Sequence, residues 1–338
     1  MYTAQLNSLQ KSVPLYLLLC TTFIFADLPT DKCPEGCVCV KRDVKCYALT
    51  EFPGSFPPLT TYIYMDEMNI QDIPPDSFHG LSFLNTVEFH RSNFGSIPTC
   101  GFKGINSLEK IIFVKCVIGH LDKFAIFNIT SPLSIEIKQS KITKMDSFAM
   151  TSLPNMIALT ISETTFYEIR THAFTNVTSA DISISNCEMK KINPKPFMFV
   201  TVSKLEIIGN KFEVLPCGTF DSLLKISTGD NAVFTGNGIL CDCGMNYVKT
   251  ISDDDRKRQL GSMNCVENGE INKNKTITEV LAGNVPCEQK SKEDDTKCRL
   301  PEITMQMPVV LCPSHNHGHD GYDHNVNDNK RNTGSQLN

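Results

Sequence analysis

The sequence lacks several features that mark common classes of protein. Its 32 Lys and Arg residues are outnumbered by 37 Asp and Glu, so it has no basic surplus for the phosphates of a nucleic acid. It contains no G-x-S-x-G or H-E-x-x-H motif and no glycine loop for phosphates, which leaves catalysis little support. Beyond residue 26 it has no run of 18 or more apolar residues, so no transmembrane helix is expected. These absences favour a binding protein without a cofactor over an enzyme.

The one prominent apolar run lies near the start of the chain. The stretch VPLYLLLCTTFIFA, residues 13–26, is too short to span a membrane and ends at the small residue Ala26. This pattern predicts a secretory signal peptide over residues 1–26, with an uncleaved signal anchor as the alternative. Cleavage would remove Cys20 and leave the other cysteines in an oxidising route, where disulfides persist. We therefore expect a secreted, extracellular protein.

A repeat of 23 or 24 residues runs through the interior. Its pattern is L-x-L-x-x-N-x-L-x-x-I, with aliphatic residues or Phe at the fixed places, as in IIFVKCVIGHL at residues 111–121. The N place is filled by Met68, Ser92, Cys116, Ser140, Thr164, Cys187 and Asn210, and an irregular eighth turn ends at Asn237. A single unit cannot bury its apolar side alone, so the units are expected to stack.

This pattern resembles that of extracellular leucine-rich repeat proteins with repeats of 24 residues. The resemblance implies a horseshoe-shaped solenoid with a concave parallel β-sheet, an irregular or 3₁₀ convex side, and a disulfide cap at each end. It places return-side phenylalanines at Phe78, Phe102, Phe148, Phe174, Phe197 and Phe220. The expected parts are a signal peptide (1–26), an N-terminal cap (27–58), seven to eight repeats (59–237), a C-terminal cap (238–288) and a polar, largely disordered tail with histidines (289–338).

Two clusters of four cysteines flank the repeats. They are Cys33, Cys37, Cys39 and Cys46 before the repeats, and Cys241, Cys243, Cys265 and Cys287 after them. Zinc is the rival to disulfides here, although secretion argues against it, and the cysteines alone leave three pairings open in each cluster. The clusters resemble the caps of the Slit, Nogo receptor and variable lymphocyte receptor group. That resemblance implies the pairs Cys33–Cys39, Cys37–Cys46, Cys241–Cys265 and Cys243–Cys287.

The six other cysteines have different expected roles. Cys298 and Cys312 flank an apolar segment outside the caps and are predicted to pair with each other. Cys100 and Cys217 fall five repeats apart, roughly 25 Å at the usual strand spacing, which is too far for a disulfide. Each of those two is predicted to be a buried thiol or half of an intermolecular bridge. Cys116 and Cys187, both at the N place, are predicted to face inward; we expect Cys116 to be buried, unpaired and unreactive.

Other residues suggest modification or metal binding. Asn128, Asn176 and Asn274 begin N-x-T sequons and are predicted N-glycosylation acceptors, with Asn128 and Asn176 on the same convex flank two turns apart. The tail contains His315, His317, His319 and His324, whose spacing suits a metal such as Zn or Cu. A disordered, solvated tail is the competing interpretation, and no metal site is assigned.

The non-fixed places of each strand point outward, because side chains alternate along a strand. In the N-terminal half these places mix aromatic, apolar and charged side chains, which is typical of protein-binding surfaces. The predicted ligand-binding face consists of Tyr62, Tyr64, Asp66, Glu88, His90, Arg91, Ile112, Val114 and Lys115. The alternative is an idle sheet with charge pairs such as Glu88 with Lys110 or Arg91.

The sequence thus predicts a secreted leucine-rich repeat protein that binds an extracellular protein or a glycan through its concave face. Adhesion, signalling, matrix and innate recognition are the settings in which proteins of this kind act. The alternative function is that of a non-catalytic scaffold or stabilising subunit of a secreted enzyme, because related proteins include the partner subunit of shrimp luciferase. Neither function involves nucleic acid, a cofactor or a membrane span.

Overall fold

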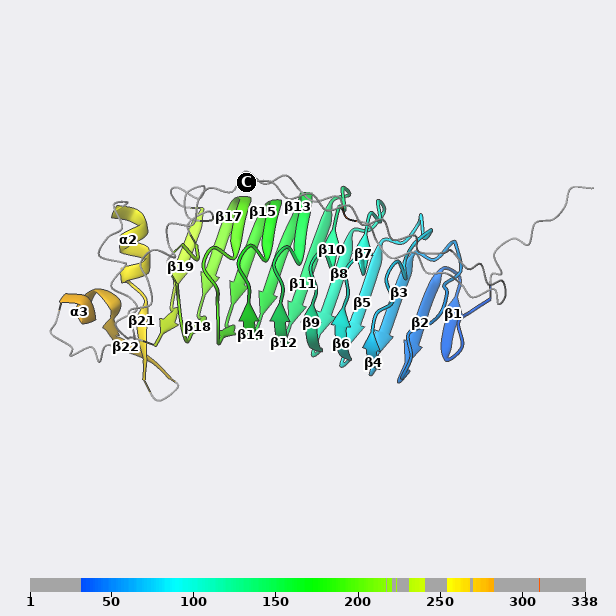
Figure 1. Ribbon diagram of the computed structural model, residues 1–338, viewed down its shortest axis with the longest axis horizontal. Coiled ribbons are helices and arrows are strands. Elements are labelled where there is room, and N and C mark those ends of the chain that lie inside the picture. Colours follow the sequence, from blue (N-terminus) through cyan, green and yellow to red (C-terminus); the bar gives the residue numbers. More distant parts are fainter. Residues whose placement is uncertain are drawn as a thin grey trace, which may run out of the picture.

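The computed structural model describes residues 32–216, 218–220, 223, 231–240, 254–267, 270–282 and 310. Over these ranges the chain winds into a stack of similar coils whose strands line up in two sheets (Figure 1). The predicted signal peptide and most of the predicted tail lie outside the described residues. The stack therefore covers the part of the chain in which the repeat was found.

The long sheet has twelve strands. Its main path is β1 (Cys37–Val40), β2 (Asp43–Tyr47), β3 (Tyr62–Asp66), β5 (Thr86–His90), β8 (Lys110–Val114), β11 (Leu133–Lys138), β13 (Met150–Ser162), β15 (Phe174–Ser185), β17 (Phe197–Ile208) and β19 (Ala232–Thr235), with β7 (Phe102–Lys103) and β10 (Ile126–Phe127) paired beside it. Strands β1 and β2 are antiparallel, and the later neighbours on this path are parallel. Equal coil lengths align equivalent residues, so that Tyr64, Glu88 and Ile112 form one row.

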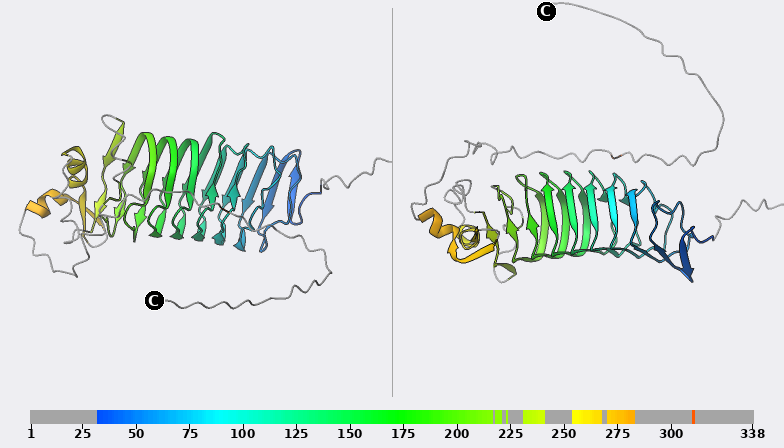
Figure 2. Two further views of the ribbon diagram at one scale, coloured as in Figure 1. Left: turned by 45° about the horizontal axis from the view of Figure 1, so that its top comes forward. Right: turned by 90° about the horizontal axis from the view of Figure 1, so that it is seen from below.

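The second sheet runs beside the long sheet along the stack (Figure 2). Its ten strands, in spatial order, are β22 (Glu270–Thr276), β21 (Asn264–Glu267), β20 (Gly238–Ile239), β18 (Lys211–Phe212), β16 (Glu188–Met189), β14 (Thr165–Ile169), β12 (Lys141–Met145), β9 (Val117–Leu121), β6 (Asn93–Ile97) and β4 (Asn69–Asp72). The return is thus more regular than the irregular or 3₁₀ conformation expected. The reason is a second inward row of β-formers, including Phe94, Ile118 and Phe166, in the same register from coil to coil.

The core lies between the two sheets and contains rows of stacked aromatic rings. Phe89 stacks on Phe113 with ring centroids 5.1 Å apart, and Phe174 stacks on Phe197 at 4.8 Å. The row that begins at Phe102 continues through Ile126 and Met150 before it returns to phenylalanine. The prediction that Phe148 fills this row is therefore wrong. The flexible side chain of Met150 takes that core place, and Phe148 lies two residues earlier at a corner of the coil.

Residues at the N place of the repeat form an inner ladder between coils. The backbone N–H of Met68 donates to Ser92 Oγ at 3.1 Å, and that of Cys187 donates to Asn210 Oδ1 at 2.9 Å. Where the ladder residue is cysteine the thiol donates instead, from Cys116 Sγ to the carbonyl of Phe89 in the preceding coil at 3.4 Å and to that of Val114 at 3.5 Å. Burial raises the pKa of the Cys116 thiol to about 11 and that of Cys187 equally. Both thiols are free and buried, so they are poor nucleophiles at neutral pH.

The coils turn at residues with positive φ, most of which are not glycine. Each of β3, β5 and β8 is followed by one, at Glu67 (58°), Arg91 (44°) and Lys115 (57°). A second corner repeats at Cys100 (68°), Phe124 (60°) and Phe148 (63°). At this corner the N–H of Cys100 donates to the carbonyl of Phe124, and that of Phe124 to the carbonyl of Phe148, at 3.0 and 2.9 Å. These bonds between coils offset the cost of about 1 kcal/mol for a left-handed residue.

These features make the architecture a leucine-rich repeat solenoid: parallel coils of 23 or 24 residues, an inner ladder, and a cap before the first coil. At the opposite end, β21 and β22 extend the second sheet and lie near the short helices α2 (Asp254–Gly261) and α3 (Ile277–Ala282). None of the helices within the described ranges is long and apolar enough to cross a membrane.

Candidate binding face

The outward side chains of the long sheet form three rows, which together we call the outer face. Each row crosses β3, β5 and β8 in that order. The three rows are Tyr62, Thr86 and Lys110; Tyr64, Glu88 and Ile112; and Asp66, His90 and Val114. Buried residues alternate with these, as Val87 and Phe89 do in β5. The strand alternation thus brings the predicted face together on three neighbouring strands, with Arg91 and Lys115 at the corners where β5 and β8 end.

Aromatic rings gather at the N-terminal end of the outer face. The Tyr64 ring lies between two others, with centroid distances of 6.1 Å to Tyr47 and 5.0 Å to His90. The phenol of Tyr64 donates to Asp66 Oδ2 at 3.3 Å, and burial is the main cause that raises the pKa of Tyr64. The pKa of Tyr62 is also raised, by burial first and then by the charge of Glu88 and a hydrogen bond to it. These tyrosines therefore stay neutral hydrogen-bond donors over the physiological range of pH.

A buried carboxylate lies at the edge of this aromatic group. Asp66 accepts a hydrogen bond from Arg91 through Oδ2, and the same guanidinium donates through Nε to Glu67 Oε1 at 3.2 Å. The other oxygen, Asp66 Oδ1, is buried and has no hydrogen-bond partner within the described part of the chain. Arg91 is about half exposed, so its charge remains accessible to a partner while it holds Asp66 in place.

Glu88 and Lys110 do not pair with each other. Glu88 Oε2 lies 3.2 Å from His90 Nε2 and contacts the hydroxyl of Tyr62, whereas Lys110 Nζ lies 3.4 Å from Glu136 Oε1. The charge pairs proposed for an idle sheet, Glu88 with Lys110 or Arg91, are absent between these described residues. The carboxylate of Glu88 instead holds the neighbouring rings of Tyr62 and His90.

The apolar part of the predicted face differs in exposure. Val114 is partly exposed and Lys115 exposed, but only 9 % of Ile112 is accessible although it lies in the outward row. Its row neighbours are Glu88 and Glu136. Ile112 therefore offers less apolar surface than its place in the repeat indicated.

Three exposed side chains that the sequence reading missed extend the outer face onto the N-terminal cap. They are Val38 (56 % exposed), Val40 (57 %) and Tyr47 (47 %). Val38 lies beside Lys45 in the row of Tyr64, and Tyr47 lies beside Asp66. The alternation in the stretch CVCV could have predicted this exposure, because the two cysteines face the cap interior and the valines between them therefore point outward.

The C-terminal half of the outer face is different. Its rows contain Thr160, Ser162, Ser183 and Ser185, all partly exposed, with no aromatic residue among them. Its charges are paired within the sheet, since Lys204 Nζ lies 2.7 Å from Glu206 Oε1 and Ser183 Oγ donates to Glu206 Oε2 at 3.3 Å. One sheet thus presents an aromatic end and a small, hydroxyl-rich end.

The cysteines of the N-terminal cap form the disulfides Cys33–Cys39 and Cys37–Cys46, the pairs that the family resemblance implies. Cys265 is disulfide-bonded, but its predicted partner Cys241 and the pair Cys243–Cys287 lie outside the described residues, as do Cys217 and the predicted pair Cys298–Cys312. Cys100 is buried and disulfide-bonded within the chain. The prediction that Cys100 is a free thiol or an intermolecular bridge is therefore wrong, because that prediction tested only Cys217 as an internal partner.

Two predicted glycan acceptors lie at a third corner of the coils, away from the outer face. Asn128 and Asn176 are exposed, have positive φ of 55° and 53°, and lie two coils apart. Asn274 lies in β22. The histidines of the tail, His315, His317, His319 and His324, lie outside the described residues.

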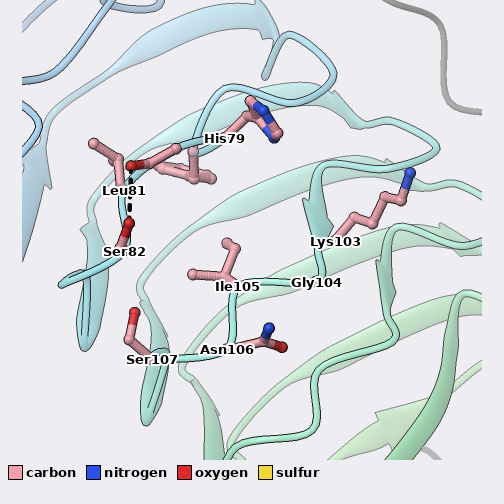
Figure 3. Close-up of a pocket in the computed structure, with 10 residues that line it drawn as sticks. His79, Leu81, Ser82, Lys103, Gly104, Ile105, Asn106 and Ser107 are labelled. Atoms are coloured by element: carbon pink, nitrogen blue, oxygen red, sulfur yellow. Dashed lines mark hydrogen bonds between the residues drawn. The ribbon is translucent and has the colours of Figure 1, made fainter.

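An open pocket of about 250 Å³ lies at the same corner, between two coils (Figure 3). Its lining includes His79, Ser82, Lys103, Asn106 and Ser107, and Ser82 bonds to the backbone carbonyl of Gly80. The lining contains no carboxylate that would act with His79 as an acid–base pair. The described residues also contain no group of three or more His, Cys, Asp or Glu suited to a metal ion.

Comparisons with known proteins give matches only among solved structures. No protein-family model matches the chain, and no curated protein matches it. The human 5T4 structure (Wnt-activated inhibitory factor 1, trophoblast glycoprotein) matches with 16 % identity and a TM-score of 0.33, over 75 % of this chain and 98 % of that chain. A chain of the octameric complex of Latrophilin 3, Unc5D and FLRT2 matches with 13 % identity and a TM-score of 0.27, over 69 % and 92 %.

Proposed function

We propose that the chain is a secreted, non-catalytic binding protein that recognises another extracellular protein through the N-terminal end of its outer face. The observation that carries this proposal is a continuous strip of exposed Val38 and Tyr47 and partly exposed Tyr64 and His90, which runs over β1 and β2 of the cap and over β3 and β5. Aromatic anchors beside an accessible arginine are the residues that dominate binding energy at protein interfaces.

The surroundings of this strip support a protein ligand. The rings are held by Asp66 and Glu88, so little side-chain freedom is lost when a partner binds. Arg91, about half exposed beside these rings, keeps N–H groups that can donate to a carboxylate or carbonyl of the partner. Glycans on Asn128 and Asn176 would project from another corner of the coils and leave the outer face open.

The test is affinity capture of extracellular proteins with the secreted chain as bait. A variant with Tyr64→Ala, His90→Ala and Arg91→Ala is compared with the matched variant Thr160→Ala, Ser183→Ala and Ser185→Ala at the other end of the same face. We expect the first variant to bind the captured partner at least tenfold more weakly, and the second to bind it as the wild type does.

Circular dichroism and thermal unfolding of both variants show whether the coils remain folded. Equal capture by the wild type and the Tyr64, His90 and Arg91 variant would exclude the proposed strip as the binding site. Capture that disappears when the partner is deglycosylated would instead identify a glycan as the ligand. A single small partner in fixed stoichiometry from the secretory medium would indicate a subunit of a larger secreted complex.

A further inference from the structure

A second apolar cluster lies outside the core, at the corner that contains Cys100. It consists of Cys100, Phe124 and Phe127, with Phe148 and Val310 packed against it, and it is separate from the core cluster between the sheets. Phe124 lies 5.6 Å from Phe127 and 6.0 Å from Phe148 between ring centroids. Corner side chains of a solenoid are ordinarily open to solvent, yet only 5 % of Phe124 and 8 % of Phe127 are accessible. Another segment therefore covers them.

Val310 identifies the covering segment. It is more than 180 residues away in sequence from Phe124, and it is the one residue described beyond position 282. The stretch LPEITMQMPVVLC at 300–312 supplies apolar residues in near alternation, namely Ile303, Met305 and Met307, followed by Val309 and Val310. About 28 residues join α3 to Val310, which span up to roughly 90 Å and are enough to run back along the stack.

Cys100 requires a partner that this segment can provide. The cap cysteines Cys33, Cys37, Cys39 and Cys46 bond to one another, and Cys116 and Cys187 are free. Cys217 stands three residues before Phe220 in the sequence, and the row of Phe220 lies five coils from Phe102, roughly 24 Å at the strand spacing, so the repeat predicts that Cys217 is beyond disulfide reach. Cys265 lies in β21, at the far end of the second sheet. Cys312 is two residues, about 7 Å of chain, from Val310.

We propose that residues 300–312 form a strap that docks on Cys100, Phe124, Phe127 and Phe148, and that a disulfide between Cys100 and Cys312 fastens it. The bond forms by thiol–disulfide exchange with a disulfide oxidant of the secretory route. One thiolate attacks the oxidant to give a mixed disulfide, and the other then displaces the oxidant's sulfur. The chain loses two protons and two electrons, and the oxidant is reduced to its dithiol. The strap replaces the predicted pair Cys298–Cys312.

Lys123 is consistent with a covered cluster. Its Nζ lies 4.9 Å from the ring centroid of Phe124 and 5.2 Å from that of Phe148, so the ammonium group closes one edge of the cluster over the ring faces. The strap thus crosses the coils at a corner, and the outer face remains free for a partner.

The test is a disulfide map of the secreted full chain. Free thiols are blocked with N-ethylmaleimide, and the protein is digested with trypsin without reduction. Trypsin cuts after Arg299, which separates Cys298 from Cys312. We expect the peptide 92–103 to be joined to the peptide 300–330. A link from 92–103 to the dipeptide 298–299, or to any other cysteine peptide, would overturn the proposal.

Variants test the docking separately from the bond. In Cys312→Ser we expect Cys100 to be alkylated and amide hydrogen exchange at residues 122–128 to become at least tenfold faster. The matched variant Cys298→Ser keeps the link between 92–103 and 300–330 and the wild-type exchange. Unchanged exchange in a Cys312→Ser protein that secretes normally would show that the strap does not cover the cluster. If that variant fails to secrete, the wild-type map still decides the pairing.

Discussion

The inside and the outside of the same strands follow different rules. The inner ladder contains Met, Ser, Cys, Thr and Asn, yet almost every one of these residues serves a hydrogen bond between coils. On the outer face the variation has the opposite meaning, because Tyr64 and its equivalent Ser183 make different contacts and present different chemistry. Substitution inside is therefore expected to change stability, and substitution outside to change binding. The predictions that follow test this separation, in order of decreasing effect.

The largest effect of any single residue on stability is expected at Asn210. Its amide accepts from the N–H of Cys187 at 2.9 Å and donates to the carbonyl of Ile184 at 2.8 Å and to Asn237 Oδ1 at 3.0 Å. Asn210→Leu leaves the buried N–H of Cys187, the carbonyl of Ile184 and Asn237 Oδ1 without these hydrogen bonds. It should therefore lower the free energy of unfolding by about 3–5 kcal/mol. Urea unfolding measures the loss. The control Thr201→Leu, exposed on β17, should change stability by less than about 0.5 kcal/mol; a similar loss in both would refute the role of the ladder.

The second effect is a loss of stability in alkali. Burial gives the thiols of Cys116 and Cys187 a pKa of about 11 in the folded protein, against 9.0 for an exposed thiol. The unfolded thiols therefore lose their protons first. The stability is fully present below pH 9 and falls as the pH rises from 9 to about 11, by about 2–3 kcal/mol for each thiol. Chemical unfolding at several pH values tracks the decrease.

The double variant Cys116→Ser and Cys187→Ser isolates the contribution of the thiols. Serine occupies the ladder at Ser92 and Ser140, so the variant should fold and keep partner capture. Its stability should decrease less steeply between pH 9 and 11 than that of the wild type, because the raised pKa values of the two thiols no longer contribute, whereas tyrosines such as Tyr64 still titrate. Identical pH profiles would show that the thiols do not contribute.

The smallest effect is expected at the cap end of the outer face. Val38→Ala with Tyr47→Ala removes two exposed side chains, so stability should change by less than about 0.5 kcal/mol. The same change should weaken partner binding by about tenfold, because Tyr47 completes the aromatic strip with Tyr64 and His90. Surface plasmon resonance with the captured partner measures the change. Leu59→Ala, also exposed in the N-terminal region, is the matched control.

Most of the fold was readable because the repeat sets the register. The N place, the strands of the long sheet and the outward rows follow from the pattern L-x-L-x-x-N, and the structure has Tyr64, Glu88 and Ile112 in one row as the period requires. The return was less readable, since alignment on phenylalanine placed Phe148 in the core where Met150 lies. The spacing of the repeat shows which residues are equivalent between coils. It does not show which of two nearby apolar residues, such as Phe148 and Met150, points into the core.

The properties of the outer face and the role of Cys100 were harder to read for a different reason. The exposure of Ile112 depends on long neighbouring side chains, and the use of Glu88 by Tyr62 and His90 depends on rotamers. Cys100 is disulfide-bonded, and Val310, which lies outside the repeats, packs against its cluster. Local pattern predicts contacts at one period, whereas contacts between the repeats and the rest of the chain follow no period.

The inner ladder also gives the solenoid a fixed length per coil. Most coils are joined to the next by a backbone N–H that donates to the N-place side chain of the following coil, so one whole coil of this kind is interchangeable with another. Removal of residues 141–164 would join Ser140 to Thr165 with every row still in phase. The parts of the outer face on either side of the deletion would move closer by one strand spacing, about 4.8 Å. The distance between the aromatic end and the hydroxyl-rich end of the outer face is thus adjustable in single steps by gain or loss of a coil, without a new fold.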